Sequence, residues 1–139
     1  MREIKFRGYS SEELISESQW LEGYGVTTIE YADNTETTHL FTPYGDYRVE
    51  KDSIGQYTGR KDKSGKEIYE GDIFKNCEGL IKLVVWKDNG FKAKYTFKRR
   101  YQGEEWSEHS FTDLGDTESR RWGVEIIGNI YENKEILEK

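Results

Sequence analysis

Several residue types are scarce in this sequence of 139 residues, and each scarcity argues against a class of protein. The single cysteine, Cys77, cannot form an internal disulfide, which argues against a secreted disulfide scaffold and favours a reducing compartment. No apolar run reaches the length of a membrane span, and residues 1–10 lack the apolar stretch of a signal peptide. We therefore expect a cytoplasmic protein that does not enter a membrane.

Histidine is almost as rare, since His39 and His109 are the only two, and neither lies near the cysteine in the sequence. A zinc site requires about four Cys or His ligands in closely spaced pairs. The phosphate-binding and nucleophile motifs GxxxxGK[ST], GxGxxG and GxSxG are also missing. We expect no metal, no cofactor and no enzymatic activity; a small hydrolase using Cys77 or His109 is the least favoured hypothesis.

Lysine and arginine are missing from Gly8 to Tyr47, a stretch that contains eight Asp and Glu residues. Because the whole chain has a formal net charge of −6, the remainder carries +2. Such an imbalance can mark a contact surface for a basic partner, and the alternative is an ordinary solvated acidic surface. The candidate acidic partner surface consists of Glu30, Asp33 and Glu36.

Proline occurs once, at Pro43, whereas glycine occurs fourteen times, a balance typical of short strands joined by tight turns. Aromatic residues make up 14% of the chain and supply large buried areas to a core otherwise poor in apolar residues. We expect one mainly β domain over residues 1–139, with short antiparallel strands in a barrel or sandwich. The sequences ADNT at 32–35 and KDNG at 87–90 predict hairpin turns. The capping-box spacing of Ser10 and Glu13 predicts one short helix over residues 13–21.

Residues 89–103, NGFKAKYTFKRRYQG, contain five basic residues, four aromatic residues and no acid. In a strand, the aromatic residues at odd positions and the lysines at even positions point to opposite faces. This alternation favours a core-facing aromatic row with a solvated lysine face, because a nucleic-acid platform presents rings and positive charge together. Nucleic-acid binding remains the alternative, and it would use Lys92, Lys94, Lys98, Arg99 and Arg100.

Residues 53–74, SIGQYTGRKDKSGKEIYEGDIF, have the composition of strands joined by two turns. Together with REIKFRG at 2–8 and VEIIGNIYEN at 124–133, this segment resembles the YopX family of bacteriophage and prophage proteins. The three segments fall in the expected order, although Arg60 and Lys134 depart from the family pattern. The residues that match the central pattern are Gly55, Gln56, Tyr57, Thr58, Gly59, Asp62, Gly65, Ile68, Tyr69, Glu70, Gly71 and Asp72.

The resemblance implies a mainly β fold, a phage-encoded protein in a bacterial cytoplasm, and self-association, but no established reaction. We assign the matching residues a structural role, because turn formers and strand residues dominate the pattern. The leading hypothesis is a non-enzymatic accessory protein that binds protein, as a homo-oligomer or through a host or phage partner. Nucleic acid is the less favoured partner.

Overall fold

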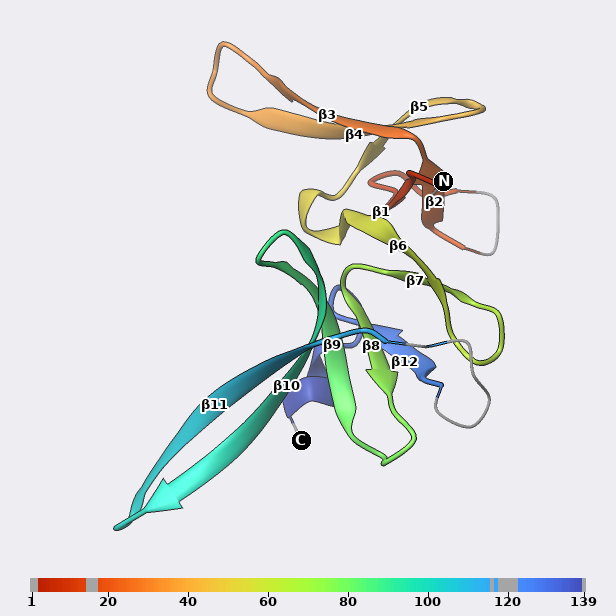
Figure 1. Cartoon of the computed structure of the whole chain (residues 1–139). Helices are drawn as coiled ribbons and strands as arrows, with labels where there is room; N and C mark the ends of the chain where they lie inside the picture. Colours follow the sequence, from red (N-terminus) through yellow and green to blue (C-terminus); the bar gives the residue numbers. More distant parts are fainter. Residues whose placement is uncertain (1–2, 15–17, 116, 118–122, 139) are drawn as a thin grey trace. The chain divides into compact units, whose positions relative to one another are not determined.

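β-Strands dominate the computed structural model, which describes residues 3–14, 18–115, 117 and 123–138 (Figure 1). Twelve strands and two short 3-10 helices are found among these residues, so the prediction of a mainly β fold is confirmed. Contacts divide the chain into two compact units, Met1–Gly59 and Arg60–Lys139. The expectation of one domain over residues 1–139 stays a prediction.

The first unit contains two antiparallel sheets. The strand order is β2-β1-β6 in one, with β7 (Glu67–Tyr69) as a fourth strand next to β6, and β3-β4-β5 in the other. β6 continues past Gly59, so its last residues belong to the second unit. The elements are β1 (Phe6–Tyr9), β2 (Trp20–Gly23), β3 (Gly25–Glu30), β4 (Glu36–Thr42), β5 (Gly45–Val49), the 3-10 helix η1 (Lys51–Ser53) and β6 (Gly55–Lys61).

Glycines let the two sheets of the first unit approach each other closely. A Cβ on Gly23 in β2 would lie 2.3 Å from the Phe41 carbonyl oxygen and 2.9 Å from Leu40 Cγ. A Cβ on Gly8 in β1 would lie 3.1 Å from the Val49 side chain. Leu40 and Val49 are buried at this contact, where the backbone of β1 and β2 takes the place that side chains would otherwise occupy.

The helix predicted over residues 13–21 is wrong where the structure describes it, because Trp20 and Leu21 lie in β2. Residues 15–17 of this stretch lie outside the described residues. The Ser10 hydroxyl accepts a hydrogen bond from Glu12 N and donates one to Glu12 O, a local turn in place of a helix cap. The Gln19 side chain accepts from Leu14 N and donates to Glu12 O, which fixes this turn further.

The second unit is built on a five-stranded antiparallel sheet with the order β11-β10-β9-β8-β12. Before it, the chain leaves β6 through a turn in which Asp62 N donates to Lys66 O, and enters β7. The elements are β7 (Glu67–Tyr69), β8 (Asp72–Lys75), β9 (Ile81–Lys87), β10 (Gly90–Tyr101), β11 (Glu104–Asp113), β12 (Glu125–Asn129) and the 3-10 helix η2 (Lys134–Glu138).

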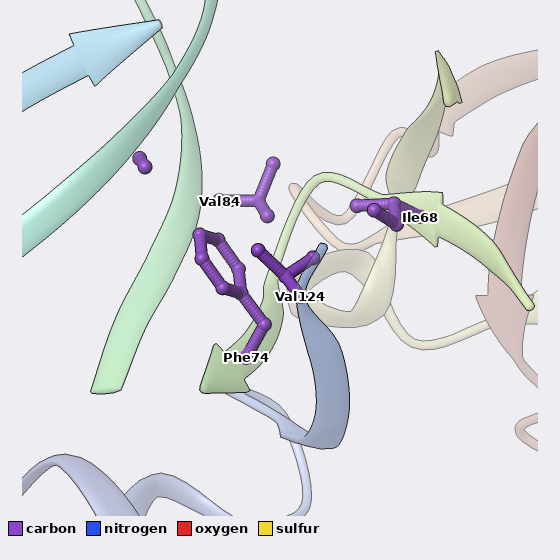
Figure 2. Close-up of a cluster of buried hydrophobic side chains, with 5 residues drawn as sticks. Ile68, Phe74, Val84 and Val124 are labelled. Atoms are coloured by element: carbon purple, nitrogen blue, oxygen red, sulfur yellow. The ribbon is translucent and has the colours of Figure 1, made fainter. Parts of the chain in front are cut away.

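A small hydrophobic core holds the second unit together (Figure 2). Phe74 of β8, Val84 of β9 and Val124 point toward one another, and Ile68 of β7 is a further labelled member of the cluster. Leu114 and Ile126 pack against the cluster. Ala93 of β10 also belongs to it. The predicted core-facing row of β10 is correct at Ala93, which is buried, whereas its aromatic members Phe91, Tyr95 and Phe97 are only half-buried. Beyond this row, Tyr101 is 67% exposed.

β10 and β11 extend beyond the rest of their sheet as a two-stranded ribbon (Figure 1). β9 pairs with β10 only from Gly90 to Lys94, whereas β11 pairs with β10 from Lys92 to Tyr101. We call residues 90–113 the β10–β11 arm. In its outer part, beyond Lys94, β10 and β11 pair only with each other. An isolated two-stranded ribbon is only marginally stable in water.

Candidate functional site

The matching residues of the central YopX pattern form turns and strand pairs. Asp62 is 3% exposed, and its Oδ1 accepts hydrogen bonds from Ser64 N and Lys66 N, both at 2.9 Å. Its Oδ2 accepts a third from Ile126 N at 3.2 Å. Gly65 adopts φ +86°, which favours glycine in this turn. One carboxylate thus fixes the turn and ties it to β12.

Asp72 performs the same kind of task in the next turn. It is 1% exposed, and its Oδ2 accepts a hydrogen bond from Tyr69 N at 2.8 Å. Gly71 N donates to Val84 O, and Gly71 O accepts from Ile130 N, so the Glu70–Gly71 turn is bonded on both sides. The Asp62 and Asp72 carboxylates therefore accept hydrogen bonds from backbone N–H groups and stabilise the two turns.

The first residues of the pattern lie along β6. Gly55 pairs with Arg7 and Gln56 with Phe6, and Tyr57 N donates to Lys5 O at 2.8 Å. Tyr57 and its neighbour Thr58 are buried. These residues hold the strand in its sheet.

The acidic candidates Glu30, Asp33 and Glu36 come together at the tip of the β3–β4 hairpin. Glu30 and Glu36 are cross-strand partners, and Asp33 lies in the turn between them. A hydrogen bond from the Thr35 hydroxyl, with a second from its backbone N–H, lowers the pKa of the Asp33 carboxyl. Glu36 Oε1 lies 2.9 Å from Lys51 Nζ. All three acids are exposed, so this tip presents carboxylates to solvent with one of them paired.

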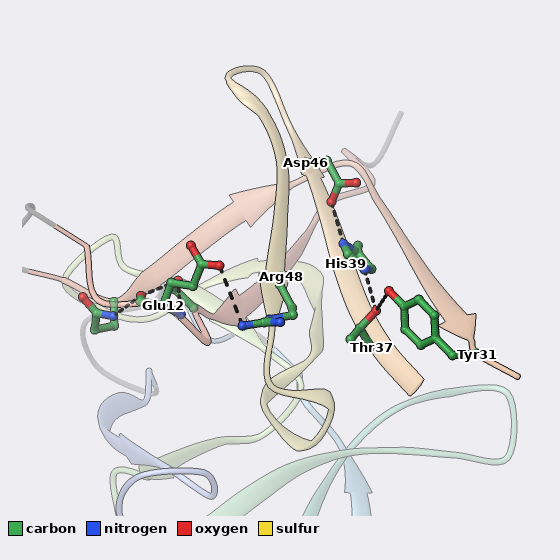
Figure 3. Close-up of polar contacts among 8 residues, drawn as sticks. Glu12, Tyr31, Thr37, His39, Asp46 and Arg48 are labelled. Atoms are coloured by element: carbon green, nitrogen blue, oxygen red, sulfur yellow. Dashed lines mark hydrogen bonds and ion pairs between the residues drawn. The ribbon is translucent and has the colours of Figure 1, made fainter. Parts of the chain in front are cut away.

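A polar network that the sequence did not predict crosses the exposed face of the β3-β4-β5 sheet (Figure 3). Asp46 Oδ1 lies 3.0 Å from His39 Nδ1, and His39 Nε2 lies 2.8 Å from Thr37 Oγ1. The Tyr31 hydroxyl continues the chain at 3.1 Å from Thr37 Oγ1. The sequence contains one indication of this network: Thr37 and His39 are two residues apart, so their side chains point to the same face of a strand.

The order carboxylate, imidazole, hydroxyl is also that of a hydrolytic triad. A triad acts together with donors aimed at the developing oxyanion, and these donors supply much of the rate. The side-chain hydrogen bonds described for Tyr31, Thr37, His39 and Asp46 run only among these four residues. We interpret the network as a ladder of side chains that orders this sheet face.

The other two reactive candidates have ordinary surroundings. His109 Nδ1 lies 2.9 Å from Thr96 Oγ1 across the β10–β11 pair. Cys77 is an exposed thiol in the turn that the Asn76 side chain closes by accepting from Glu78 N and Leu80 N. Within the described ranges, no group of three or more His, Cys, Asp and Glu residues is placed to hold a metal ion. No described helix is long and apolar enough to cross a membrane.

The basic candidates all lie on the β10–β11 arm, and β11 supplies acids to most of them. Arg99 Nε and Glu108 Oε2 are 2.8 Å apart, and Glu105 contacts both Arg100, at 2.8 Å, and Lys98, at 3.4 Å. Lys92 Nζ lies 2.6 Å from Asp113 Oδ1. Four of the five basic candidates are thus paired, and among the described ion pairs none involves Lys94. The arm has five basic and four acidic residues, so its net charge is only +1.

These ion pairs also hold the acids of β11 in their charged form. Hydrogen bonds from Arg100 and Lys98 lower the pKa of the Glu105 carboxyl. The Trp106 indole N–H donates to Glu108 and, with the charge of Arg99, lowers the pKa of that carboxyl. The lowered pKa values extend the pH range in which these two carboxyls are ionised to more acidic pH.

Aromatic side chains gather on one face of the arm. Tyr95, Phe97 and Tyr101 alternate along β10, and Trp106 lies opposite Arg99 on the same face. The Tyr95 and Phe97 rings stack at 5.8 Å, and the Arg99 guanidinium lies 5.3 Å from the centre of the Phe97 ring. Trp106 is 42% exposed. The sequence prediction missed Trp106 because it considered β10 without its partner strand.

Comparisons with known proteins agree with the sequence resemblance. The model of the YopX protein family matches residues 5–138 of the chain. A solved structure, protein EF1440 from Enterococcus faecalis, is similar to this chain with 23% identity and a TM-score of 0.50, covering 99% of each chain. This likeness concerns the fold. Among curated proteins, none matches the chain. The match of the family model over nearly the whole length shows that the chain belongs to the YopX family.

Proposed function

We propose that this protein is a non-enzymatic accessory protein of a phage or prophage that acts in the bacterial cytoplasm by binding protein. We further propose that it forms a homo-oligomer, with the β10–β11 arm contacting a second copy of the chain. The single observation that carries the proposal is the aromatic face of the arm. It lies on the part of the ribbon that extends past β9.

The composition of this face is that of a protein interface. Tyr, Trp and Arg are enriched at the centres of protein interfaces, where large rings become desolvated. Tyr101 and Trp106 are 67% and 42% exposed in the isolated chain. A two-stranded ribbon gains little stability alone, so covering this face with a second copy would stabilise both the arm and the contact.

The edge of the arm is less suited to association than its face. β11 is an edge strand, and Glu104, Glu105 and Glu108 lie along it. Charged residues on an edge strand discourage pairing with another sheet. We therefore expect the two copies to meet through their aromatic faces.

Nucleic-acid binding is the competing function, and the ion pairs of the arm argue against it. A nucleic-acid surface gains affinity when its cations replace counterions on phosphates. Here four basic side chains already lie within 4 Å of carboxylates of the neighbouring strand. Phosphates would have to displace those carboxylates or be repelled by them.

The test is the solution mass by light scattering over a range of protein concentrations, at low and high salt, with and without nucleic acid. We expect the mass of an oligomer at both salt concentrations, unchanged by nucleic acid. The double variant Tyr101→Ser with Trp106→Ser should have the mass of a monomer. Tyr44→Ser is the matched control, because Tyr44 is an exposed aromatic residue of the first unit. A wild-type monomer at all concentrations, or an arm variant that keeps the wild-type mass, would overturn the proposal. A mass increase with nucleic acid that salt abolishes would support the competing function.

A further inference from the structure

A groove of about 400 Å³ lies within the first unit, between the amino-terminal segment, β2 and the β4–β5 turn. Its volume is within the range of ligand pockets, about 300–1,000 Å³. It is lined by rings and by charged side chains on neighbouring elements. The rings are those of Trp20, Tyr24, Pro43, Tyr44 and Tyr47, and the charged side chains are Glu3, Lys5 and Glu22.

The aromatic wall of the groove is held in place by other contacts. Trp20 meets the edge of Tyr9 with ring centres 5.3 Å apart, and the Arg7 guanidinium lies 4.8 Å from its ring centre. The Thr42 hydroxyl accepts from Tyr44 N and donates to Gly45 O, which closes the turn that presents Tyr44. Tyr44 is nonetheless 89% exposed and Tyr24 is 62% exposed. The hydrogen-bonded turn thus presents the Tyr44 ring to solvent, and this ring contributes little to the core of the first unit.

The charge of the groove is negative. Glu3 and Glu22 lie 3.1 Å and 3.7 Å from Lys5 Nζ, so two carboxylates face one ammonium group. Each of the two carboxylate side chains is 58% exposed, whereas that of Lys5 is 13% exposed. An approaching ligand therefore meets the carboxylates before the ammonium group.

The surrounding unit adds to this field. Residues 1–59 include eleven Asp and Glu residues and five Lys and Arg residues, so the first unit carries the whole net charge of −6. The second unit, with equal numbers of acidic and basic residues, is neutral in sequence. A surface with one sign of charge raises the local concentration of ligands of the opposite sign.

We propose that this groove binds an arginine side chain carried on an extended segment of a partner protein. A guanidinium stacks on aromatic faces and forms paired hydrogen bonds with carboxylates, and this groove offers both groups side by side. The chain already uses the same stacking inside the unit, where Arg7 packs on Trp20. Exposed rings beside carboxylates would hold the guanidinium, and Pro43 would pack against the extended backbone of the partner.

This site differs from the arm in position and in partner. It lies entirely in the first unit and does not depend on self-association through residues 90–113. A neutral ligand such as a sugar would also stack on the rings, but it would leave the charge of the groove unused. The response to ligand charge therefore separates the two ligands.

The experiment is a fluorescence-anisotropy titration of the full chain with a short labelled peptide of alternating proline and arginine. A peptide with citrulline in place of arginine has nearly the same shape without the charge. We expect the arginine peptide to bind at least about tenfold more tightly, a difference near 1.4 kcal/mol, and to weaken with salt. Equal affinities of the two peptides, or no binding of either, would overturn the proposal, as would stronger binding of a neutral oligosaccharide.

Variants of the groove test the assignment of residues. Tyr44→Ala and Glu22→Gln should each weaken arginine-peptide binding severalfold, and Lys5→Gln should strengthen it by removing the competing charge. Tyr101→Ala on the arm is the matched control and should bind as the wild type does. Circular dichroism of every variant separates loss of binding from loss of fold. If Tyr44→Ala folds and binds unchanged, the groove is not the site.

Discussion

Arg99 of β10 and Glu108 of β11 lie on the same face of the arm, with Nε and Oε2 2.8 Å apart. The basic run in β10 is therefore partly neutralised, because β11 of the same ribbon supplies the counterion of Arg99. Both side chains are partly exposed, so the pair contributes little stability, as surface ion pairs generally do. The ion pair has a larger electrostatic effect, since it reduces the positive charge that would otherwise attract phosphate groups to the arm.

Neutralising the acids of β11 should increase the nucleic-acid affinity of the arm, which we expect to be low in the wild type. The double variant Glu105→Gln with Glu108→Gln changes the arm from +1 to +3 and releases Lys98, Arg99 and Arg100 from their partners. We expect salt-dependent binding of single-stranded DNA in an electrophoretic or anisotropy assay, and wild-type binding at least about tenfold weaker. Glu78→Gln with Glu132→Gln, the same charge change outside the arm, is the control. Tight binding by the wild type would contradict the interpretation.

Asp62 should be among the least replaceable acids of the chain. Asp62→Ala removes the acceptor of three partly buried backbone N–H groups, and each hydrogen bond contributes about 0.5–1.5 kcal/mol. We expect a loss of about 3 kcal/mol or more in the free energy of unfolding, measured by urea denaturation. Asp62→Asn keeps one acceptor oxygen and should lose less. An alanine variant with wild-type stability would show that these bonds are not needed.

Local turn chemistry was predictable from the sequence. KDNG forms the expected hairpin, with Lys87 opposite Gly90 and positive φ at Asp88 and Asn89. ADNT forms the expected turn between Glu30 and Glu36. In both turns the residues that tolerate positive φ are adjacent in sequence, so no distant contact has to be known.

Features that depend on strand register were not predictable in the same way. Arg99 meets Glu108 and His39 meets Asp46 as diagonal neighbours on adjacent strands, because the register places Arg99 opposite Trp106 and His39 opposite Arg48. The helix prediction failed for a related reason. Ser10 and Glu13 favour a cap locally, but β2 pairing with β1 places Trp20 opposite Tyr9, and this tertiary contact overrides the local preference.

Gly23 should not tolerate a side chain, because the backbone of Phe41 occupies that space. Gly23→Ala would place a Cβ 2.3 Å from a carbonyl oxygen, and overpacking typically costs about 1–3 kcal/mol. We expect a loss of at least about 2 kcal/mol in urea denaturation. Gly25→Ala is the control, since its nearest neighbour would be Phe41 Cδ2 at 3.5 Å. Equal stability of the two variants would refute the close contact.

Asp33 gives a pH-dependent prediction at the acidic hairpin tip. The Thr35 hydroxyl lowers the pKa of its carboxyl, so the ionised form stabilises the folded state above about pH 4, the ordinary value. That contribution disappears as the pH falls through the lower, folded-state pKa. NMR titration should give Asp33 a midpoint below its ordinary value, and Thr35→Val should move it upward. Identical midpoints in the two proteins would contradict the assigned cause.

The Asp46, His39 and Thr37 network provides the sharpest test of the non-enzymatic proposal. If it only orders a sheet face, hydrolysis of an activated ester should stay at the background rate, and Thr37→Val or His39→Gln should leave it unchanged. The same variants should lower stability by about 0.5–1.5 kcal/mol for each hydrogen bond removed. His109→Gln is the matched control for imidazole chemistry elsewhere on the chain. A wild-type rate well above background that disappears in Thr37→Val and persists in His109→Gln would make the network catalytic and overturn the proposal.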